Sequence, residues 1–362
     1  MPQTPRVSVF IPVHNRADYI RVAVDSILAQ DFEDFELIVV DDGSTDATPD
    51  VLAAYEDRRL RVARHDTNLG IPAARNRGLE LARGEYLALL DSDDHAYPQR
   101  LGRQVAWLDA HPDIVQIGSW CSFMDADGRL MNKVRRQPLR PDDLRAHLLF
   151  HCPVINRTVM ARTAVLKDLR YNPEFPRCQD FDMHARLIEQ GHRIANLPEL
   201  LVCGREHPGR FTGKTEGLGR ERKMAVFARL LGQIGIDADA RDLACHYALA
   251  RPKQAPDAPE VFLDWAESWL WRIKQANRST GFFPEPSLSR VLGAIWALNC
   301  WHARRALGRR AALARLAGSA LVRGVPGNFD ARFLMHAFRR AQVPQGVSMS
   351  AGGTSGAKSN ES

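Results

Sequence analysis

The sequence contains no apolar segment long enough to cross a membrane. A membrane-spanning helix needs about 20 predominantly apolar residues, and the 362-residue chain has no such run. The longest apolar candidate, 291–301, is about half that length and is typical of a core helix or an interfacial helix. The N-terminal segment, 1–6, also lacks the basic and then apolar arrangement of a signal peptide.

Cysteines are also sparse in this chain. There are 6 of them, more than 20 residues separate each from the next, and none forms a CxxC pair. A zinc ribbon needs closely paired cysteines, and a small disulfide-stapled domain needs a denser set, so both classes are excluded. We expect reduced thiols and a cytoplasmic protein.

The positive charge is concentrated near the C-terminus. The formal net charge is +6, but the segment 301–340 holds nine arginines and one aspartate, so the rest of the chain is slightly negative. The apolar and arginine-rich stretch 291–340 fits an interfacial helix on an anionic membrane surface. It equally fits a helical bundle with arginine on its solvent-exposed face. No nucleic-acid-binding motif occurs, so we expect no nucleic-acid partner.

Strand and helix patterns alternate through the first hundred residues. The predicted strands are 7–12, 35–40, 60–63 and 85–90. Such alternation predicts an α/β fold with a doubly wound, mostly parallel central sheet and helices on both faces. In these sheets ligands bind at the carboxyl ends of the strands.

Beyond residue 100 the pattern is mixed and then becomes helical. We expect a strand at 154–160 and a closing strand at 200–203. The domain organisation that follows is an α/β domain over 1–215 and a helical C-terminal region over 216–342. The Gly- and Ser-rich segment 343–362 is predicted to be disordered.

An acidic cluster, Asp91-Ser92-Asp93-Asp94, follows the strand predicted at 85–90. Three carboxylates within four residues repel one another unless a cation neutralises them. Their hard oxygen ligands suit Mg²⁺ or Mn²⁺, which often share their coordination shell with substrate phosphates. The alternative is a solvated acidic loop that caps the next helix.

A second acidic pair, Asp41-Asp42, ends the strand predicted at 35–40 and is followed by Gly43 and Ser44. A carboxylate at this place can accept hydrogen bonds from a nucleobase or a ribose. The alternative is an Asx turn in which Ser44 caps the following helix.

Three further residues are candidates for binding or catalysis. Arg75 could pair with a diphosphate, or it could lie on a solvated helix face. Asp180 opens a predicted helix and is either a general base or a capping residue. His207 follows the closing strand and is a candidate metal or phosphate ligand, or a surface histidine.

Taken in order, these segments closely resemble glycosyltransferase family 2. The resemblance covers about residues 5–210. The matching segments are 7–15 (VSVFIPVHN), 39–45 (VVDDGST), 68–78 (NLGIPAARNRG), 84–94 (GEYLALLDSDD), 179–187 (QDFDMHARL) and 205–207. The resemblance implies a GT-A fold, an inverting mechanism and a nucleotide-sugar donor.

The resemblance also assigns roles on the donor side. Asp91-Ser92-Asp93 matches the DXD motif, which holds a divalent metal, Mn²⁺ or Mg²⁺, and the ribose and diphosphate of the donor. Asp93 is the first choice for the metal ligand, and Asp94 is the other acid that could face the ion. Asp42 matches the acid that recognises the base, with Asp41 beside it.

Other donor contacts follow by the same analogy. Pro12, His14 and Asn15 would line the nucleotide pocket, and Arg75 would lie near the base and the diphosphate. Arg205 and His207 match an Arg-x-His element that closes over the diphosphate, where His207 is also a candidate metal ligand.

On the acceptor side, Asp180 matches the catalytic base of the family. The residue before it is Gln179 instead of the usual glutamate, and the tryptophan expected after the second acid is replaced within 182–184. Both departures affect the acceptor site more than the chemistry.

The sequence therefore predicts a metal-dependent enzyme that moves a sugar from a nucleotide-sugar, with a UDP-sugar as the default, to a hydroxyl acceptor. The acceptor would be a glycan or a lipid-linked saccharide in surface polysaccharide synthesis, and the enzyme would be cytoplasmic or peripheral on the inner membrane face. The alternatives are a sugar nucleotidyltransferase and a non-enzymatic basic scaffold. A nucleotidyltransferase would need a Gly-rich, lysine-bearing loop after the first strand, where 11–15 reads IPVHN.

Overall fold

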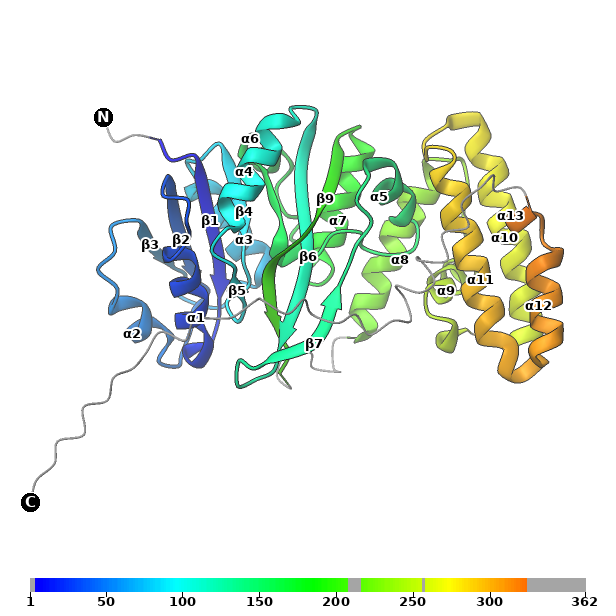
Figure 1. Ribbon diagram of the computed structural model, residues 1–362, viewed down its shortest axis with the longest axis horizontal. Helices are drawn as coiled ribbons and strands as arrows, with labels where there is room; N and C mark the ends of the chain where they lie inside the picture. The colour runs from blue at the N-terminus through cyan, green and yellow to red at the C-terminus, as the bar shows by residue number, and fades with distance from the viewer. Residues whose placement is uncertain (1–3, 208–215, 256–257, 324–362) are drawn as a thin grey trace, which may run out of the picture.

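The computed structural model describes residues 4–207, 216–255 and 258–323. A central sheet with helices on both faces occupies one part of the molecule, and a group of helices lies at its other end (Figure 1). The predicted α/β class with a helical C-terminal region is confirmed.

Parallel strands form the half of the sheet that the sequence predicted. They are β1 (Val7–Val13), β2 (Phe35–Asp41), β3 (Leu60–Arg64) and β4 (Tyr86–Leu89), in the order β3-β2-β1-β4. Within these pairs Val13 lies opposite Asp41 and Phe10 lies opposite Leu89. The carboxyl ends of β1, β2 and β4 therefore meet at one edge, which brings the two acidic segments together.

The other half of the sheet is mixed. It contains β5 (His95–Ala96), β6 (Ile114–Met124), β7 (Leu130–Arg135), β8 (Met160–Arg162) and β9 (Arg193–Arg205). β6 runs parallel to β9 but antiparallel to β7 and β8. Because β8 also joins β4 in an antiparallel pair, it connects the two halves of the sheet.

The strand predicted over 154–160 is wrong in its position. Residues Asn156–Thr158 form a short 3-10 helix, η1, and the strand β8 begins only at Met160. The Thr158 hydroxyl donates to the carbonyl of Ile155 at 2.7 Å and so closes this turn. The turn carries Arg157, whose side chain passes over Gly204 of β9 and reaches Asp94 of the acidic cluster.

Alternate residues of the strands face two separate apolar cores. Phe10 of β1 belongs to one core, whereas Val9 and Ile11 belong to the other. Such burial on both faces is what a sheet covered by helices on each side requires. The helices are α1 (Ala17–Leu28), α2 (Thr48–Ala53), α3 (Ile71–Leu81), α4 (Arg100–Ala110), α5 (Pro141–His147), α6 (Thr163–Leu169) and α7 (Gln179–Glu189).

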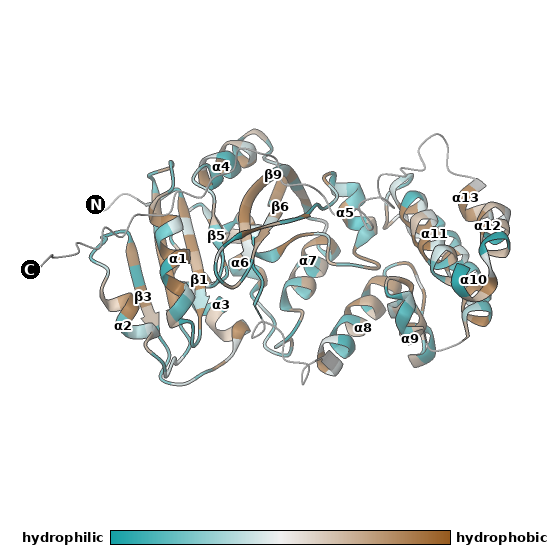
Figure 2. Ribbon diagram, turned by 60° about the horizontal axis from the view of Figure 1, so that its bottom comes forward, coloured by the Kyte–Doolittle hydropathy of each residue, from teal (hydrophilic) through white to brown (hydrophobic). Residues whose placement is uncertain are grey.

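The described residues after 215 are almost entirely helical. They form α8 (Glu216–Gly232), α9 (Ala240–Leu249), η4 (Pro252–Gln254), α10 (Pro259–Thr280), α11 (Ser287–Leu307), α12 (Arg309–Gly318) and α13 (Ala320–Arg323). Helices α8 and α9 lie between α7 and the group α10–α13 (Figures 1 and 2). The expected division at 215/216 stays a prediction, and the tail 343–362 lies outside the described residues.

The apolar stretch 291–301 lies within α11, which packs in the helical group. Val291 is buried and the Trp296 side chain is fully buried, whereas Trp301 is 51% exposed. This burial favours the bundle interpretation for the first half of the stretch. Among the helices of the described residues, none is long and apolar enough to span a bilayer.

Candidate active site

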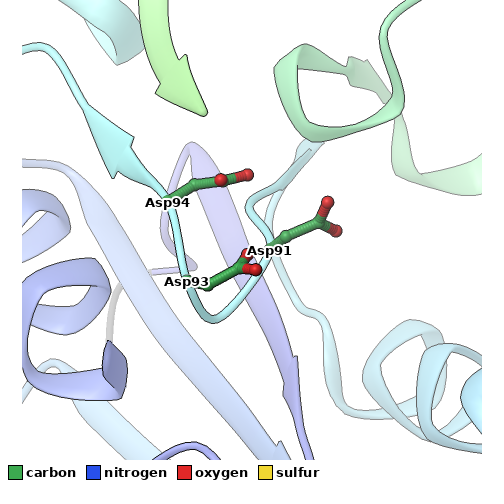
Figure 3. Close-up of side chains that lie close together, drawn as sticks. All are labelled: Asp91, Asp93 and Asp94. Carbon is green, nitrogen blue, oxygen red and sulfur yellow. The ribbon is translucent and has the colours of Figure 1, made fainter. Parts of the chain in front are cut away.

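The loop between β4 and β5 gathers three carboxylates. Potential ligand atoms of Asp91, Asp93 and Asp94 all lie within 4.8 Å of one another. Their side chains project to the same side of the loop (Figure 3). Asp94 is fully buried, whereas the Asp91 side chain is about one-third exposed. The sequence prediction that these acids cluster is therefore confirmed.

A buried cation, Arg157, compensates part of this negative charge. Its guanidinium Nη1 donates to Asp94 Oδ1 at 2.5 Å, and its Nη2 lies 3.6 Å from Asp91 Oδ2. Burial raises the pKa of Asp94 well above its usual value, the Arg157 charge opposes this shift, and the charges of Asp93 and Asp91 add to it. Gly204 permits the close approach, because a Cβ at this residue would lie 2.6 Å from Arg157 Nη1.

The end of β9 closes over the acidic loop. His207 Nε2 lies 2.9 Å from Asp93 Oδ2, and the Arg205 backbone N–H donates to Asp94 Oδ1 at 2.9 Å. The Arg205 guanidinium donates to the main-chain carbonyls of Asp93 and Ala126. In this arrangement Arg205 holds the loop in place, and its predicted contact with the donor diphosphate stays a prediction.

The potential metal-ligand atoms of the acidic loop fit a divalent cation. Asp91 and Asp93 offer carboxylate oxygens at the cleft surface, and the imidazole of His207 lies beside Asp93. Asp94 Oδ2 is buried without a hydrogen-bond partner among the described residues. Carboxylate oxygens are the ligands that Mg²⁺ and Mn²⁺ prefer, so Asp91 and Asp93 suit the predicted ion. Asp94 is mainly paired with Arg157.

The second acidic segment organises the neighbouring loop. Asp42 accepts hydrogen bonds from the backbone N–H groups of Leu69 and Gly70, at 3.0 and 2.8 Å, and lies 2.7 Å from His65 Nδ1. Asp41 is buried and accepts from the Ser44 backbone N–H at 3.0 Å. Asp42 lines the cleft and Asp41 does not.

Gly43 makes this turn possible. Its φ is +68°, and a Cβ would lie only 2.4 Å from the carbonyl carbon of Thr67. A glycine is the residue that tolerates both the positive φ and the close approach.

The segment after β1 borders the same cleft. Pro12, His14 and Asn15 all line the cleft, and their contact with a nucleotide stays a prediction. Asn15 Oδ1 accepts from the Thr45 backbone N–H at 2.8 Å, and His14 Nδ1 lies 2.9 Å from the Asp42 carbonyl oxygen. These bonds fix the loop after β1 against the loop after β2.

Arg75 is the clearest anion-binding candidate of this region. It is buried on α3, its guanidinium lies over the Tyr171 ring at 5.2 Å, and Nη2 lies 3.8 Å from Asp91 Oδ1. Its Nε and Nη1 atoms have no hydrogen-bond partner among the described residues. A buried donor without a partner is costly, so a phosphate oxygen bound here would satisfy atoms that the fold leaves open.

Asp180 lies in the first turn of α7 and lines the same cleft as the acidic cluster. The N-terminal end of a helix favours a negative charge. One turn later, His184 is buried, and Gln116 Nε2 lies 3.0 Å from its Nδ1. Burial lowers the pKa of His184 to about 4, so the imidazole beside Asp180 is neutral near pH 7.

One continuous cleft of about 1930 Å³ connects these groups. Of the predicted site residues, Asp41, Asp94, Arg205 and His207 are not part of its lining. The predicted residues that line it are Pro12, His14, Asn15, Asp42, Arg75, Asp91, Ser92, Asp93 and Asp180. Sequence reasoning missed Arg157 and His184. The available signal for Arg157 was a charged residue inside the mostly apolar run 153–161.

Known proteins share this sequence pattern. The profile of the family described as Glycosyl transferase family 2 matches residues 8–163. A Bacillus subtilis protein named "Putative teichuronic acid biosynthesis glycosyltransferase TuaG" is 38% identical over 202 residues, which cover 55% of this chain and 78% of TuaG. The chain belongs to glycosyltransferase family 2.

Further comparisons agree with membership of glycosyltransferase family 2. The succinoglycan biosynthesis protein ExoO of Rhizobium meliloti is 44% identical over 211 residues, which cover 54% of this chain and 59% of ExoO. The crystal structure of S. aureus TarS 1–349 in complex with UDP-GlcNAc superposes with a TM-score of 0.52 at 22% identity, covering 87% of this chain and 92% of that chain. The TarS similarity supports the GT-A fold.

Proposed function

We propose that this glycosyltransferase moves a sugar from a nucleotide-sugar donor to an acceptor hydroxyl with inversion at the anomeric carbon. The observation that carries the proposal is the shared cleft, which Asp91, Asp93, Arg75 and Asp180 all line. A leaving-group site and a general base thus face the same space.

On the donor side, Asp91, Asp93 and His207 would hold a divalent cation. When bound, such an ion supplies positive charge that stabilises the diphosphate leaving group. Arg75 would donate to diphosphate oxygens through its open Nε and Nη1 atoms, and Asp42 would present a carboxylate to the base or the ribose. These side chains are held in place before the substrate binds, which is the arrangement that electrostatic stabilisation requires.

On the acceptor side, Asp180 would take the proton from the attacking hydroxyl. The acceptor oxygen forms a bond to the anomeric carbon while the bond from that carbon to the diphosphate oxygen breaks on the opposite face. The electron pair leaves with the nucleoside diphosphate, and the configuration inverts. General base catalysis of this kind contributes about 10²–10⁴-fold to the rate.

We further propose a glycan or a lipid-linked saccharide as acceptor, in surface polysaccharide synthesis. The names of TuaG and ExoO, which refer to teichuronic acid and succinoglycan biosynthesis, support this choice. A UDP-sugar is the first donor to test.

The decisive experiment is a donor screen followed by one substitution. Release of UDP, GDP or dTDP from the matching sugar donors is measured with Mn²⁺ or Mg²⁺ and with a mixture of saccharide acceptors. Asp180→Asn should lower kcat by about 10²–10⁴-fold and preserve nucleotide binding, measured by calorimetry. The matched control, Asp168→Asn, alters an exposed carboxylate on α6 and should retain full turnover.

Two results would contradict the proposal. Near-normal turnover by the Asp180→Asn variant would remove Asp180 as the base. Release of pyrophosphate from a nucleoside triphosphate and a sugar phosphate would instead establish a sugar nucleotidyltransferase.

A peripheral membrane contact through 291–340 is a separate proposal. It is supported by Trp301 and Leu313, which are 51% and 59% exposed, and by Arg304, whose guanidinium lies 3.8 Å from the Trp301 ring centroid. Exposed aromatic and basic side chains of this kind suit an anionic leaflet. The wild-type protein should float with anionic vesicles, and Trp301→Ala should reduce the fraction that floats. Equal flotation of the wild type with neutral vesicles would contradict the proposal.

A further inference from the structure

The lining of the cleft also carries a group of cations. Five of them come from separate parts of the chain: Arg135, Arg177, Arg220, Lys223 and Arg251. Across the described ranges, none of these five forms a salt bridge with a carboxylate. Arg290, which also lines the cleft, differs because its guanidinium pairs with Asp143 at 2.6 Å. We refer to the five residues as the basic cluster.

Two of these guanidinium groups are held against one aromatic ring. Arg251 and Arg220 lie over the Tyr247 ring, at 4.5 and 5.4 Å from its centroid. The Arg251 Nη1 atom is buried and has no hydrogen-bond partner within the described part of the chain. A guanidinium held by packing but left with an open donor is suited to receive an anion.

The charges converge on a common space. Burial lowers the pKa of His151 to about 3, and the positive charges of Arg251, Arg135 and Lys223 contribute to that shift. The same Arg251 and Lys223 act on the Cys178 thiol, where they oppose the rise in pKa that burial causes. Residues from β7, α8 and the segment after α9 therefore place their charges around one point.

This point borders the candidate base. Cys178 precedes Asp180 by two residues, and the negative charge of Asp180 also acts on the Cys178 and Cys152 thiols. The basic cluster thus lies beside Asp180, the proposed base for the acceptor hydroxyl. The donor diphosphate has its own candidate partners at the acidic loop.

Cations gathered without a salt bridge to a carboxylate repel one another, and the fold keeps them together in a cleft that excludes part of the solvent. We propose that the acceptor carries a phosphate ester or diphosphate group next to its reacting hydroxyl, and that the basic cluster binds this group. The inference rests on the proposed glycosyl transfer and names the chemical class of its acceptor. Several guanidinium and ammonium donors match the oxygens of a phosphate better than the two oxygens of one carboxylate.

The test compares acceptors that differ only in charge. One sugar is offered as its neutral octyl glycoside and as its octyl phosphate-linked form, and kcat/KM is measured from nucleotide release. Because a charge-assisted hydrogen bond contributes about 1.5–3 kcal/mol, we expect a preference of about 10- to 100-fold for the phosphate-linked acceptor. A short prenyl diphosphate-linked sugar and a phosphodiester-linked oligosaccharide then distinguish a lipid carrier from a polymer as the source of the phosphate.

Substitutions connect the preference to the basic cluster. Lys223→Gln and Arg251→Gln should each lower the ratio of kcat/KM between charged and neutral acceptor by about 10-fold, and Arg251→Lys should restore part of it. Arg278→Gln, which removes an exposed arginine on α10 outside the cleft, should leave the ratio unchanged. Octyl phosphate should inhibit competitively with the acceptor and not with the donor.

The outcomes separate this inference from the proposed function. If no nucleotide-sugar is turned over with any acceptor or with water, the proposed glycosyl transfer itself fails. If donors are hydrolysed or transferred but charged and neutral acceptors have equal kcat/KM, the inference about the acceptor fails and the transfer activity stands. A preference that survives both glutamine substitutions would likewise overturn the assignment to the basic cluster.

Discussion

His246 provides a quantitative test of how the helical part is held together. It is fully buried on α9, its ring packs against Phe150 and Phe227, and its Nε2 lies 2.6 Å from the Leu149 carbonyl oxygen. The indole N–H of Trp269 on α10 donates to its Nδ1 at 2.9 Å. The neutral imidazole therefore connects α9 to α10 and to the end of α5, with Nδ1 as acceptor and Nε2–H as donor.

Burial lowers the pKa of His246 from 6.5 to about 4. A lowered pKa of a histidine in the folded state means that the unfolded chain takes up the proton first. The stabilising contribution is therefore present above pH 6.5 and is lost as the pH falls toward 4. Each pKa unit corresponds to about 1.4 kcal/mol, so between pH 7 and pH 5 the loss from this one side chain is about 2 kcal/mol.

The assay is denaturant unfolding at pH 7 and at pH 5, with one variant that does not titrate. His246→Gln can keep both hydrogen bonds, so its stability should fall about 2 kcal/mol less than that of the wild type over this interval. Trp269→Phe removes the indole donor but keeps the histidine, so it should be less stable at both pH values and should retain the wild-type dependence on pH. Equal dependence on pH in His246→Gln and the wild type would refute the reasoning.

Other predictions concern the active site. Arg157→Met leaves Asp94 buried without its counter-charge and should lower the free energy of unfolding, measured in metal-free buffer, by about 3–5 kcal/mol. The control Arg129→Met changes an exposed arginine and should have little effect. An Arg157→Met variant as stable as the wild type would contradict this account. Asp93→Ala should abolish the enhancement of nucleoside diphosphate binding by Mn²⁺ in calorimetry, and an unchanged enhancement would exclude Asp93 as a ligand. Arg75→Gln should weaken nucleoside diphosphate binding by about 10-fold or more and affect the free nucleoside much less.

The parallel half of the sheet was predictable because its signals are local. Buried apolar runs end directly at Asp41 and Asp91, and parallel pairing of their strands then brings both acidic segments to one edge. The order of the strands was not predicted, because the alternation of patterns does not say that β4 pairs with β1 and not with β3. The same reasoning placed Asp180 at the start of a helix, where the structure has it.

The surroundings of the acids could not be predicted in the same way. Arg157 contacts Asp94 across 63 positions of sequence, and it arrives there because a 3-10 turn interrupts an expected strand. Arg205 turned out to bind main-chain carbonyls of the loop, a role that depends on how β9 ends and not on residue type. The basic cluster escaped notice because its members come from four separated segments, whereas the positive charge visible in the sequence lies after residue 300.

The apolar core joins the sheet to the helices after residue 215, so the stability of the two parts is coupled. One continuous set of buried side chains runs from Phe10 of β1 through Phe181 of α7 and Phe227 of α8 to Trp296 of α11. The segment that the family profile recognises ends at residue 163, well before this core ends. Because the two parts share one interior, a substitution that leaves a cavity at Trp296 should also lower the stability of β1 and α7, the elements next to the proposed donor pocket and the proposed base. The described helices α8–α13 therefore stabilise the sheet that carries the candidate site, independent of anything they bind on their outer face.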